Sequence, residues 1–470
     1  MDRVLRWVVV AVAAVAVSCT PAPTKPLFTE RQIQPSAVDN PAGIGDPYFP
    51  KYGNSGYDVS RYTIKIKYDP ATKRLTGHTS ITAVATEQLT RFHLDFHGLQ
   101  VEQVRVGSAA AQHTRDGDEL IIVPPAAIDA KKEFQVEVSY QGVPTPFSSP
   151  GFGTTGFLST RDGAFVIGQP ESATTWFPVN DHPRDKATYR IEVTVPEGAA
   201  GVSNGLLEGK STKDGWTTWN WVVNSPMASY LSTLAIGDYR IVEGTHNGKP
   251  VFTAIANSIP SGQIDKDIAR TAEIADFLAS KFGAYPFDAY GGIVVDDDRV
   301  RIALETQTRP IYSDVFWTRG TNTTVVAHEI AHQWFGDSVS VDTWEHIWLN
   351  EGFATYAQWM WNEHSGGPKI QAEFDSRYAD RNNRIWEVPP GKPGRENMFS
   401  ASVYQRGGMT LHALRKEIGD EDFFKILQVW AAEQRDGLAT TTEFIELSER
   451  VSGEQLDDLF DAWLFEVGRP

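Results

Sequence analysis

A His-Glu-x-x-His motif at residues 328–332 constrains the fold of this chain more than any other feature. On an α-helix, residues four apart lie on the same face, so His328 and His332 can bind one metal ion. Glu329 projects near the same site, where its carboxylate can activate a metal-bound water. Glu351, nineteen positions after His332, is the expected third ligand on a following helix. Two histidines and one carboxylate leave one Zn²⁺ position open, as a catalytic zinc requires. The motif therefore predicts two helices that supply the ligands of one Zn²⁺ per chain.

The 470-residue chain is long enough for two or three domains, and its first half has the pattern of β-strands. Apolar and polar side chains alternate in the runs 62–68, 134–140 and 189–195, as they do in strands with one buried face. Asp-Gly and Asn-Gly pairs separate such runs, and no helical periodicity interrupts them. These features predict an N-terminal all-β domain, a large sandwich or saddle, over residues 47–245.

The hydrophobic period changes after residue 245. A strand pattern at 251–255 and two more strands within 291–304 surround an amphipathic helix at 264–282. Helices are then expected at 323–335, which carries the motif, at 346–363, which carries Glu351, and at 409–418, 423–433, 442–451 and 456–465. The second half, residues 246–470, is therefore predicted to be a mixed sheet followed by helices, and the whole chain to be a multidomain α+β protein.

The N-terminus has the features of a targeting segment. Arg3 and Arg6 precede an apolar stretch at 7–17 that is too short to span a membrane comfortably. Small residues then precede Cys19, the only cysteine of the chain, as in a bacterial lipobox. We interpret residues 1–18 as a signal peptide and 19–46, which is rich in proline, as a lipid-anchored tether. The protein is then expected on the outer face of the bacterial cell membrane; an ordinary secretory signal would release it instead.

The net charge of −17 excludes one class of partner. Nucleic-acid-binding proteins need basic faces, so no nucleic-acid partner is expected.

The motifs together resemble the aminopeptidase N and leukotriene-hydrolysing family of zinc metallopeptidases, the gluzincins. That family has His-Glu-x-x-His, eighteen residues and then Glu, which is the spacing found here between His332 and Glu351. Trp-Phe-Gly-Asp at 334–337 and Trp-Leu-Asn-Glu-Gly-Phe-Ala at 348–354 also match the family. The segment 177–187 is similar to another of its motifs, with Val179 in place of a cysteine. The resemblance implies a thermolysin-like catalytic domain and covers about residues 46–470.

The resemblance also implies roles for several residues. Ala303 and Glu305 lie where the family has Gly-Ala-Met-Glu-Asn, whose Glu binds the free α-amine of the substrate. Gln169 and Glu171 correspond to a Gln-x-Glu segment of the β domain, whose acid binds the same amine. Tyr404 corresponds to a tyrosine that assists at the oxyanion. By general chemistry, Asp337 is a candidate to orient a zinc-binding histidine.

These roles predict an extracytoplasmic zinc aminopeptidase that acts on peptides with a free N-terminus. Glu329 is the predicted general base, and Tyr404 stabilises the developing charge. Because the chain ends near the expected end of the catalytic domain, we expect the short two-domain form without a large C-terminal helical domain. Two alternatives are a zinc endopeptidase or related hydrolase of the same fold, and an inactive surface-binding protein.

Overall fold

The computed structural model describes residues 42–149 and 153–470. The predicted signal peptide, Cys19 and most of the tether lie outside the described residues. Among the residues described, no helix is both long enough and apolar enough to cross a bilayer.

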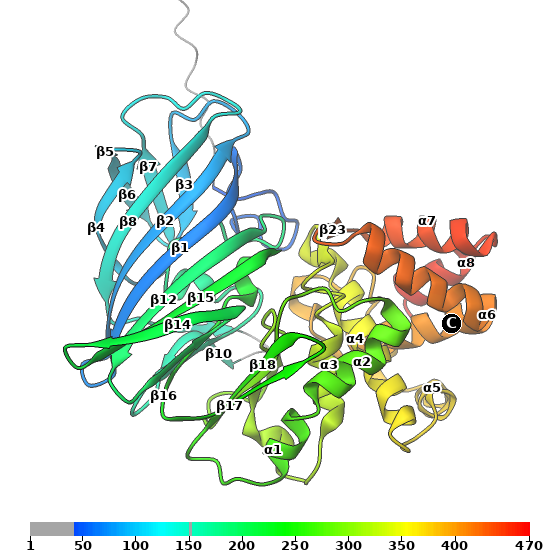
Figure 1. Ribbon diagram of the computed structural model, residues 1–470. Helices are drawn as coiled ribbons and strands as arrows, with labels where there is room; N and C mark the ends of the chain where they lie inside the picture. Colours follow the sequence, from blue (N-terminus) through cyan, green and yellow to red (C-terminus); the bar gives the residue numbers. More distant parts are fainter. Residues whose placement is uncertain (1–41, 150–152) are drawn as a thin grey trace, which may run out of the picture. The chain divides into compact units, whose positions relative to one another are not determined.

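The largest sheet of the N-terminal half has eight strands, and Figure 1 shows its long central strands side by side. In spatial order the strands are β14 (Leu206–Lys213), β15 (Trp216–Met227), β12 (Ala187–Pro196), β1 (Tyr57–Asp69), β2 (Arg74–Ala85), β8 (Glu133–Gly142), β4 (Gln100–Val106) and β5 (Ala109–Ala110). In β1 the side chains of Tyr62, Ile64, Ile66 and Tyr68 are buried. The alternation predicted for residues 62–68 is therefore confirmed, because one face of β1 packs into the core.

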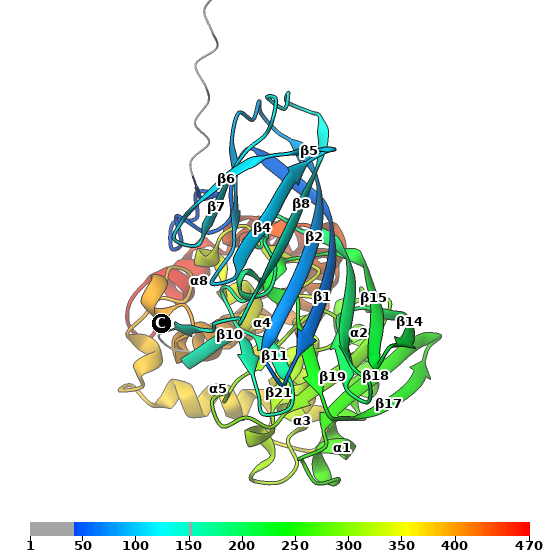
Figure 2. The ribbon, with the colours of Figure 1, turned by 90° about the vertical axis from the view of Figure 1, so that its left-hand side faces the viewer.

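Two smaller sheets complete the β-rich half (Figure 2). One contains β13 (Ala200–Ser203), β16 (Leu234–Gly237), β11 (Ala164–Ile167), β10 (Gly153–Ser159) and β9 (Phe147–Ser149), and the other β3 (Phe92–Asp95), β7 (Glu119–Val123) and β6 (Gln112–Asp116). The predicted turns lie between strands: Asp214 and Gly215, which join β14 to β15, have φ of 52° and 77°. Two positive φ angles in a row are typical of a two-residue type I′ hairpin turn.

A mixed five-stranded sheet opens the second half. Its order is β17 (Tyr239–His246), β18 (Lys249–Ala256), β19 (Tyr290–Val295), β21 (Ile311–Ser313) and β20 (Ala303–Leu304), with β18, β19 and β21 parallel. Because β17 pairs with β18 along its whole length, this sheet begins at Tyr239. The boundary that we placed after residue 245 thus falls within its first strand.

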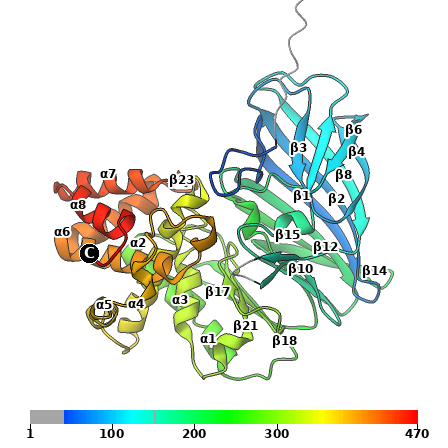
Figure 3. The same ribbon diagram turned by 180° about the vertical axis from the view of Figure 1, so that it is seen from behind.

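Helices form the rest of the second half (Figure 3). They are α1 (Gln263–Ile268), α2 (Thr271–Phe282), α3 (Thr323–Ala331), α4 (Trp348–His364), α5 (Ile370–Ala379), α6 (Gly407–Glu433), α7 (Thr441–Ser452) and α8 (Asp457–Phe460). A further two-stranded pair joins β22 (Ser340–Val341) to β23 (Leu438–Ala439).

Some helix bounds differ from those predicted. The single helix expected at 264–282 is two, because Arg270 leaves helical geometry and the Thr271 hydroxyl donates to the Ile268 carbonyl at 2.7 Å. The motif helix ends at Ala331 and not at Phe335. The helix expected at 456–465 continues beyond α8 only as a π-helical turn. Helix α5 was not predicted, because only two of its residues are buried and its sequence has little periodicity.

Arg309 joins the β-rich half to the mixed sheet. Its guanidinium is buried between the rings of Trp221 and Phe252, 4.8 and 5.0 Å from their centroids. It donates to the carbonyls of Phe252 at 3.2 Å and Gly205 at 3.0 Å, and also to that of Ser203. Burial lowers the pKa of Arg309 to about 9.

Replacing Arg309 by Met is expected to destabilise the protein by roughly 3 to 5 kcal/mol, because it leaves buried carbonyls without donors. Thermal and urea unfolding measure the effect. Arg299 is the matched control, since it is exposed and paired with Asp297 at 2.6 Å, and Arg299→Met should cost less than about 1 kcal/mol. An equal decrease in the free energy of unfolding in the two variants would contradict the stabilising role of the buried Arg309 contacts.

Candidate active site

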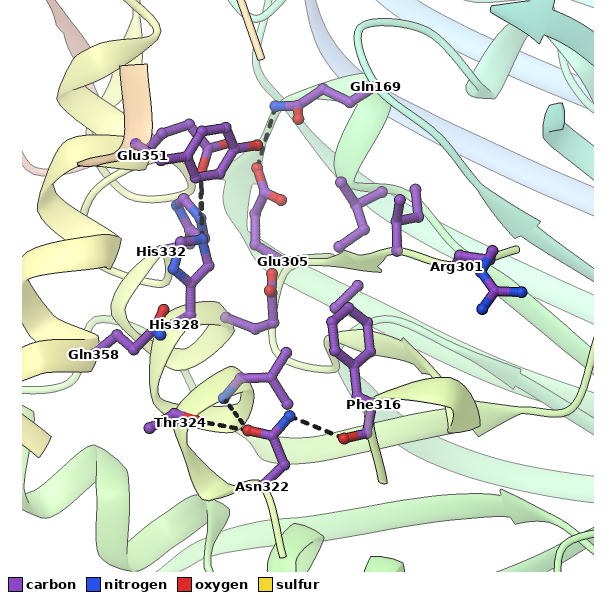
Figure 4. Close-up of a pocket in the computed structure, with 16 residues that line it drawn as sticks. Gln169, Arg301, Glu305, Phe316, Asn322, Thr324, His328, His332, Glu351 and Gln358 are labelled. Carbon is purple, nitrogen blue, oxygen red and sulfur yellow. Dashed lines mark hydrogen bonds and ion pairs between the residues drawn. The ribbon is translucent and has the colours of Figure 1, made fainter. Parts of the chain in front are cut away.

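The predicted metal ligands line a cavity of about 340 Å³ between α3, α4 and the loop after β20 (Figure 4). Of the nine residues predicted to bind the metal or the substrate or to act in catalysis, eight line it: Gln169, Ala303, Glu305, His328, Glu329, His332, Glu351 and Tyr404. The ninth, Glu171, lies in an adjoining cavity.

Three donor atoms converge where the sequence predicts a metal ion. The Nε2 atoms of His328 and His332 lie 3.3 and 3.5 Å from Oε2 of Glu351. For metal–ligand bonds of about 2.0 to 2.1 Å, a tetrahedron has edges of about 3.4 Å. The spacing and the donor types therefore fit Zn²⁺, which these three residues would hold at the wall of the cavity.

Local structure fixes the imidazole of His332. Its Nδ1 lies 3.1 Å from the carbonyl oxygen of Phe335. A carbonyl can only accept, so Nδ1 carries the proton and the Nε2 lone pair is free for a metal ion. Asp337 does not perform this role: both of its carboxyl oxygens are buried and have no hydrogen-bond partner among the residues described.

A close backbone contact positions Glu351 against Tyr404. A Cβ on Gly352 would lie 2.9 Å from the carbonyl carbon of Gly407, so α4 and the start of α6 can touch there only because both residues are glycine. Tyr404 lies in the π-helical turn Ser402–Arg406 that precedes α6. Its ring lies parallel to that of His328, with centroids 6.0 Å apart.

Glu305 is buried beside the metal ligands and is held by both halves of the protein. Its Oε1 accepts hydrogen bonds from the hydroxyl of Tyr230 at 3.0 Å and from Nε2 of Gln169 at 3.3 Å. Its backbone carbonyl accepts a hydrogen bond of 2.9 Å from the side chain of Gln333. Gln333 directly follows His332, the second histidine of the motif. The carboxyl oxygens of Glu305 and Glu329 lie within 4.8 Å of a nitrogen of His332.

Burial and neighbouring charges control the acids of the cavity. Burial raises the pKa of Glu305 and also that of Glu329. Burial acts in the same sense on Glu351, but the charge of His332 and the hydrogen bonds from both imidazoles outweigh it, and its pKa falls to about 2. Three carboxyl groups thus share one buried site, which favours the binding of cations.

Glu171 does not line the cavity that contains Glu305. It lines the adjoining cavity, which shares Gln169 with the first one. The hydroxyl of Tyr52 donates a hydrogen bond to its Oε1, and burial raises the pKa of Glu171 to about 7.

The sequence did not reveal Tyr52, Tyr230 or Gln333 as residues that support the site. Tyr52 lies in a bend and Tyr230 in a short 3₁₀ turn of the β-rich half, and neither belongs to a spaced motif. For Gln333, the only available signal is its place directly after His332.

Comparison with known proteins places both halves of the chain in one family. The Peptidase M1 N-terminal domain matches residues 58–231, and the Peptidase family M1 domain matches residues 272–463. Glutamyl aminopeptidase of Rattus norvegicus is 26% identical over 337 residues, which is 66% of this chain and 35% of that enzyme. The chain therefore spans about a third of the length of this relative.

Solved structures match over nearly their whole length. The crystal structure of an M1 zinc metallopeptidase from Deinococcus radiodurans is 28% identical, with a TM-score of 0.83, and the match covers 91% of this chain and 98% of that one. A mutant of that enzyme bound to a Tyr-Ser-Ala substrate matches with 26% identity, the same TM-score and the same two coverages.

Proposed function

Because this chain belongs to peptidase family M1, we propose that it is a zinc aminopeptidase that removes N-terminal residues from peptides. The observation that carries the proposal is the position of Glu305. A buried carboxyl group beside the metal ligands, with no Lys or Arg bonded to it among the described residues, is suited to bind the ammonium group of a free N-terminus. The substrate would then be fixed with its first peptide bond at the metal site.

We assign a different role in the reaction to each of several side chains of the cavity. Zn²⁺ held by His328, His332 and Glu351 would supply Lewis acidity for the scissile carbonyl and for a water molecule. Glu329 would take the proton of that water and deliver it to the leaving amine.

Two further groups would act on the substrate. Burial raises the pKa of Tyr404 well above its ordinary value, so its phenol stays protonated and can donate a hydrogen bond to the carbonyl oxygen as charge develops. Glu305 would hold the ammonium group, and Glu171 lines the adjoining cavity that shares Gln169 with this one. Ala303 lines the wall of the cavity that contains Glu305.

The relatives support the same substrate class. A mutant of the related enzyme from Deinococcus radiodurans has been solved with a Tyr-Ser-Ala substrate, a short peptide.

A paired set of substrates tests the proposal. The zinc-loaded full-length protein would be given aminoacyl-coumarin amides with a free amine, each beside its N-acetylated form. We expect hydrolysis of the free-amine forms alone, because acetylation removes the charge that Glu305 binds. Cleavage of internal bonds in blocked peptides would favour an endopeptidase, and zinc binding without any cleavage would favour a binding protein.

Replacing Tyr404 by Phe is expected to lower kcat by roughly 10² to 10³-fold with little change in KM, because the lost hydrogen bond acts mainly in the transition state. Steady-state kinetics and zinc content measure this. Tyr378→Phe is the control, since that hydroxyl bonds to the carbonyl of Pro470 outside the cavity. Full activity in the Tyr404→Phe variant would remove the residue from the mechanism.

We also propose that the enzyme works outside the cytoplasm and is anchored by lipid at Cys19. The charged and apolar order of residues 3–17 and the single cysteine of the chain support this. Mass spectrometry of the mature N-terminus tests it: an acylated Cys19 is expected, with release of a Cys19→Ser variant into the soluble fraction. An unmodified Cys19 in a membrane-free protein would contradict the anchor.

A further inference from the structure

A second cavity, of about 260 Å³, adjoins the proposed active site. Gln169 lines both cavities, and its side chain donates to Glu305. Aromatic rings form much of the wall of the second cavity: Phe49, Tyr52, Phe147 and Phe399. The rings of Phe49 and Tyr52 are stacked, with centroids 4.7 Å apart.

The first two rings come from a segment that precedes the region matched by the family. The match to the Peptidase M1 N-terminal domain begins at residue 58, whereas Phe49 and Tyr52 belong to residues 42–56, which we call the entry segment.

The entry segment is firmly attached to the rest of the protein. The carboxylate of Asp46 is buried and accepts hydrogen bonds from the backbone amides of Phe49 and Trp344, each at 2.9 Å, and lies 3.1 Å from Nε2 of His182. The hydroxyl of Tyr48 accepts from the amide of Gly394 at 2.8 Å. These contacts hold the two rings in place, so the cavity wall is preformed.

The position of the cavity matches the geometry of a bound N-terminus. The side chain and the ammonium group of the first residue share one Cα atom, so the side chain must lie next to the group that binds the ammonium. The proposed ammonium site is Glu305, and the space beside it across Gln169 is the second cavity.

We propose that Phe49 and Tyr52 of the entry segment make the second cavity a pocket for an aromatic N-terminal side chain, and that they determine this specificity. The inference rests on the proposed function and adds the class of substrate. An aromatic side chain would gain from edge or stacked contacts with the rings of the wall.

The charges around the cavity do not favour a charged side chain instead. Arg395 and Glu396 are both exposed at its edge and have opposite signs. The guanidinium of Arg395 lies 4.8 Å from the ring centroid of Phe49, which places a positive charge in the wall of the cavity and disfavours a lysine or arginine side chain there. Glu171 already accepts a hydrogen bond from Tyr52.

Substrate ratios in three variants test the inference. The measured quantity is kcat/KM for the coumarin amide of Phe divided by that for Ala, with the zinc-loaded full-length protein. We expect the wild type to prefer Phe by tenfold or more. Tyr52→Ala should reduce this ratio by roughly fivefold, the effect of one aromatic contact. Tyr52→Phe keeps the ring and should keep the ratio within about twofold of the wild type.

Lys51→Ala is the control, because Lys51 directly precedes Tyr52 in the same segment, is exposed and lines neither cavity. This variant should change kcat/KM for the Phe and Ala substrates by the same factor, so their ratio should stay as in the wild type. If Tyr52→Ala also changed both equally, or if the wild type preferred Ala or Arg, the assigned specificity would be wrong.

Binding separates this inference from the proposed function. Calorimetry of the zinc-loaded Glu329→Gln protein with L-phenylalaninamide and L-alaninamide gives the same ratio without turnover. Tighter binding of phenylalaninamide that is lost in the Glu329→Gln, Tyr52→Ala double variant supports the pocket even if no substrate is hydrolysed. Equal binding of the two amides overturns the pocket even if hydrolysis is found.

Discussion

Replacing Glu329 by Gln is expected to lower kcat for free-amine substrates by roughly 10³-fold, within the range that general base catalysis contributes. Glutamine has nearly the same shape but cannot accept the proton of the attacking water. Glu329 is buried on α3 between the two histidines, so no other group on that helix can replace it. Steady-state kinetics with a free-amine coumarin substrate measures the decrease in kcat.

The control for this variant is Glu345→Gln. Glu345 is partly buried near the start of α4 but does not line the cavity, so its neutralisation should leave kcat within about twofold of the wild type. Zinc content should stay at one ion per chain in both variants, because the proposed ligands are His328, His332 and Glu351 and not Glu329. Activity close to wild type in the Glu329→Gln variant would show that the proton is taken by another route.

Removing zinc is expected to abolish activity and to lower the thermal unfolding temperature. His332→Ala takes away a buried ligand whose Nε2 lies 3.5 Å from Glu351, so the ion should bind far more weakly and kcat/KM should fall by roughly 10³-fold or more. Chelation of the wild type should have the same effect and should be reversed by added zinc. A ligand that binds only the folded protein stabilises it, so the loss of zinc should also lower the unfolding temperature.

His346→Ala is the control for the loss of zinc. His346 also lies close to α4, but its Nδ1 is 3.1 Å from the Thr441 hydroxyl and it does not line the cavity. Metal content by mass spectrometry should therefore be one zinc per chain in His346→Ala and near zero in His332→Ala. Full zinc occupancy and activity in the His332→Ala variant would contradict the assigned ligand set.

The sequence predicted the parts of the fold and site that depend on short-range patterns. Residues four apart on one helix determine where His328 and His332 point, and the alternation of residues 62–68 determines which face of β1 is buried. The fixed spacing between His332 and Glu351 predicted Glu351 as the third ligand. In each case the relevant contacts follow from the local geometry of one helix or one strand.

The rest depends on contacts between distant segments. Tyr230 reaches Glu305 across 75 residues, and Tyr52 reaches Glu171 across 119. Neither tyrosine belongs to a periodic run, so no local pattern identifies its partner. The π-helical turn that contains Tyr404 is likewise held by a distant segment. Arg406 of this turn donates hydrogen bonds to the carbonyls of Trp463 and Ala462, each at 2.9 Å.

The sequence pattern does not predict the end of the motif helix either. The motif helix stops at Ala331 because the backbone then turns more tightly: the amides of Gln333 and Trp334 donate to the carbonyls of Ile330 and Ala331, three residues back. Helical periodicity in the sequence continues past that point and gives no sign of these bonds.

A crystal structure of the zinc-loaded Glu329→Gln protein with a tripeptide that begins with phenylalanine tests the central claim most directly. We expect one zinc ion about 2.0 to 2.2 Å from His328, His332 and Glu351, with the substrate ammonium group on Glu305 and the first peptide bond at the metal. A peptide that runs through the site with its N-terminus away from Glu305, or zinc bound by other residues, would contradict the account.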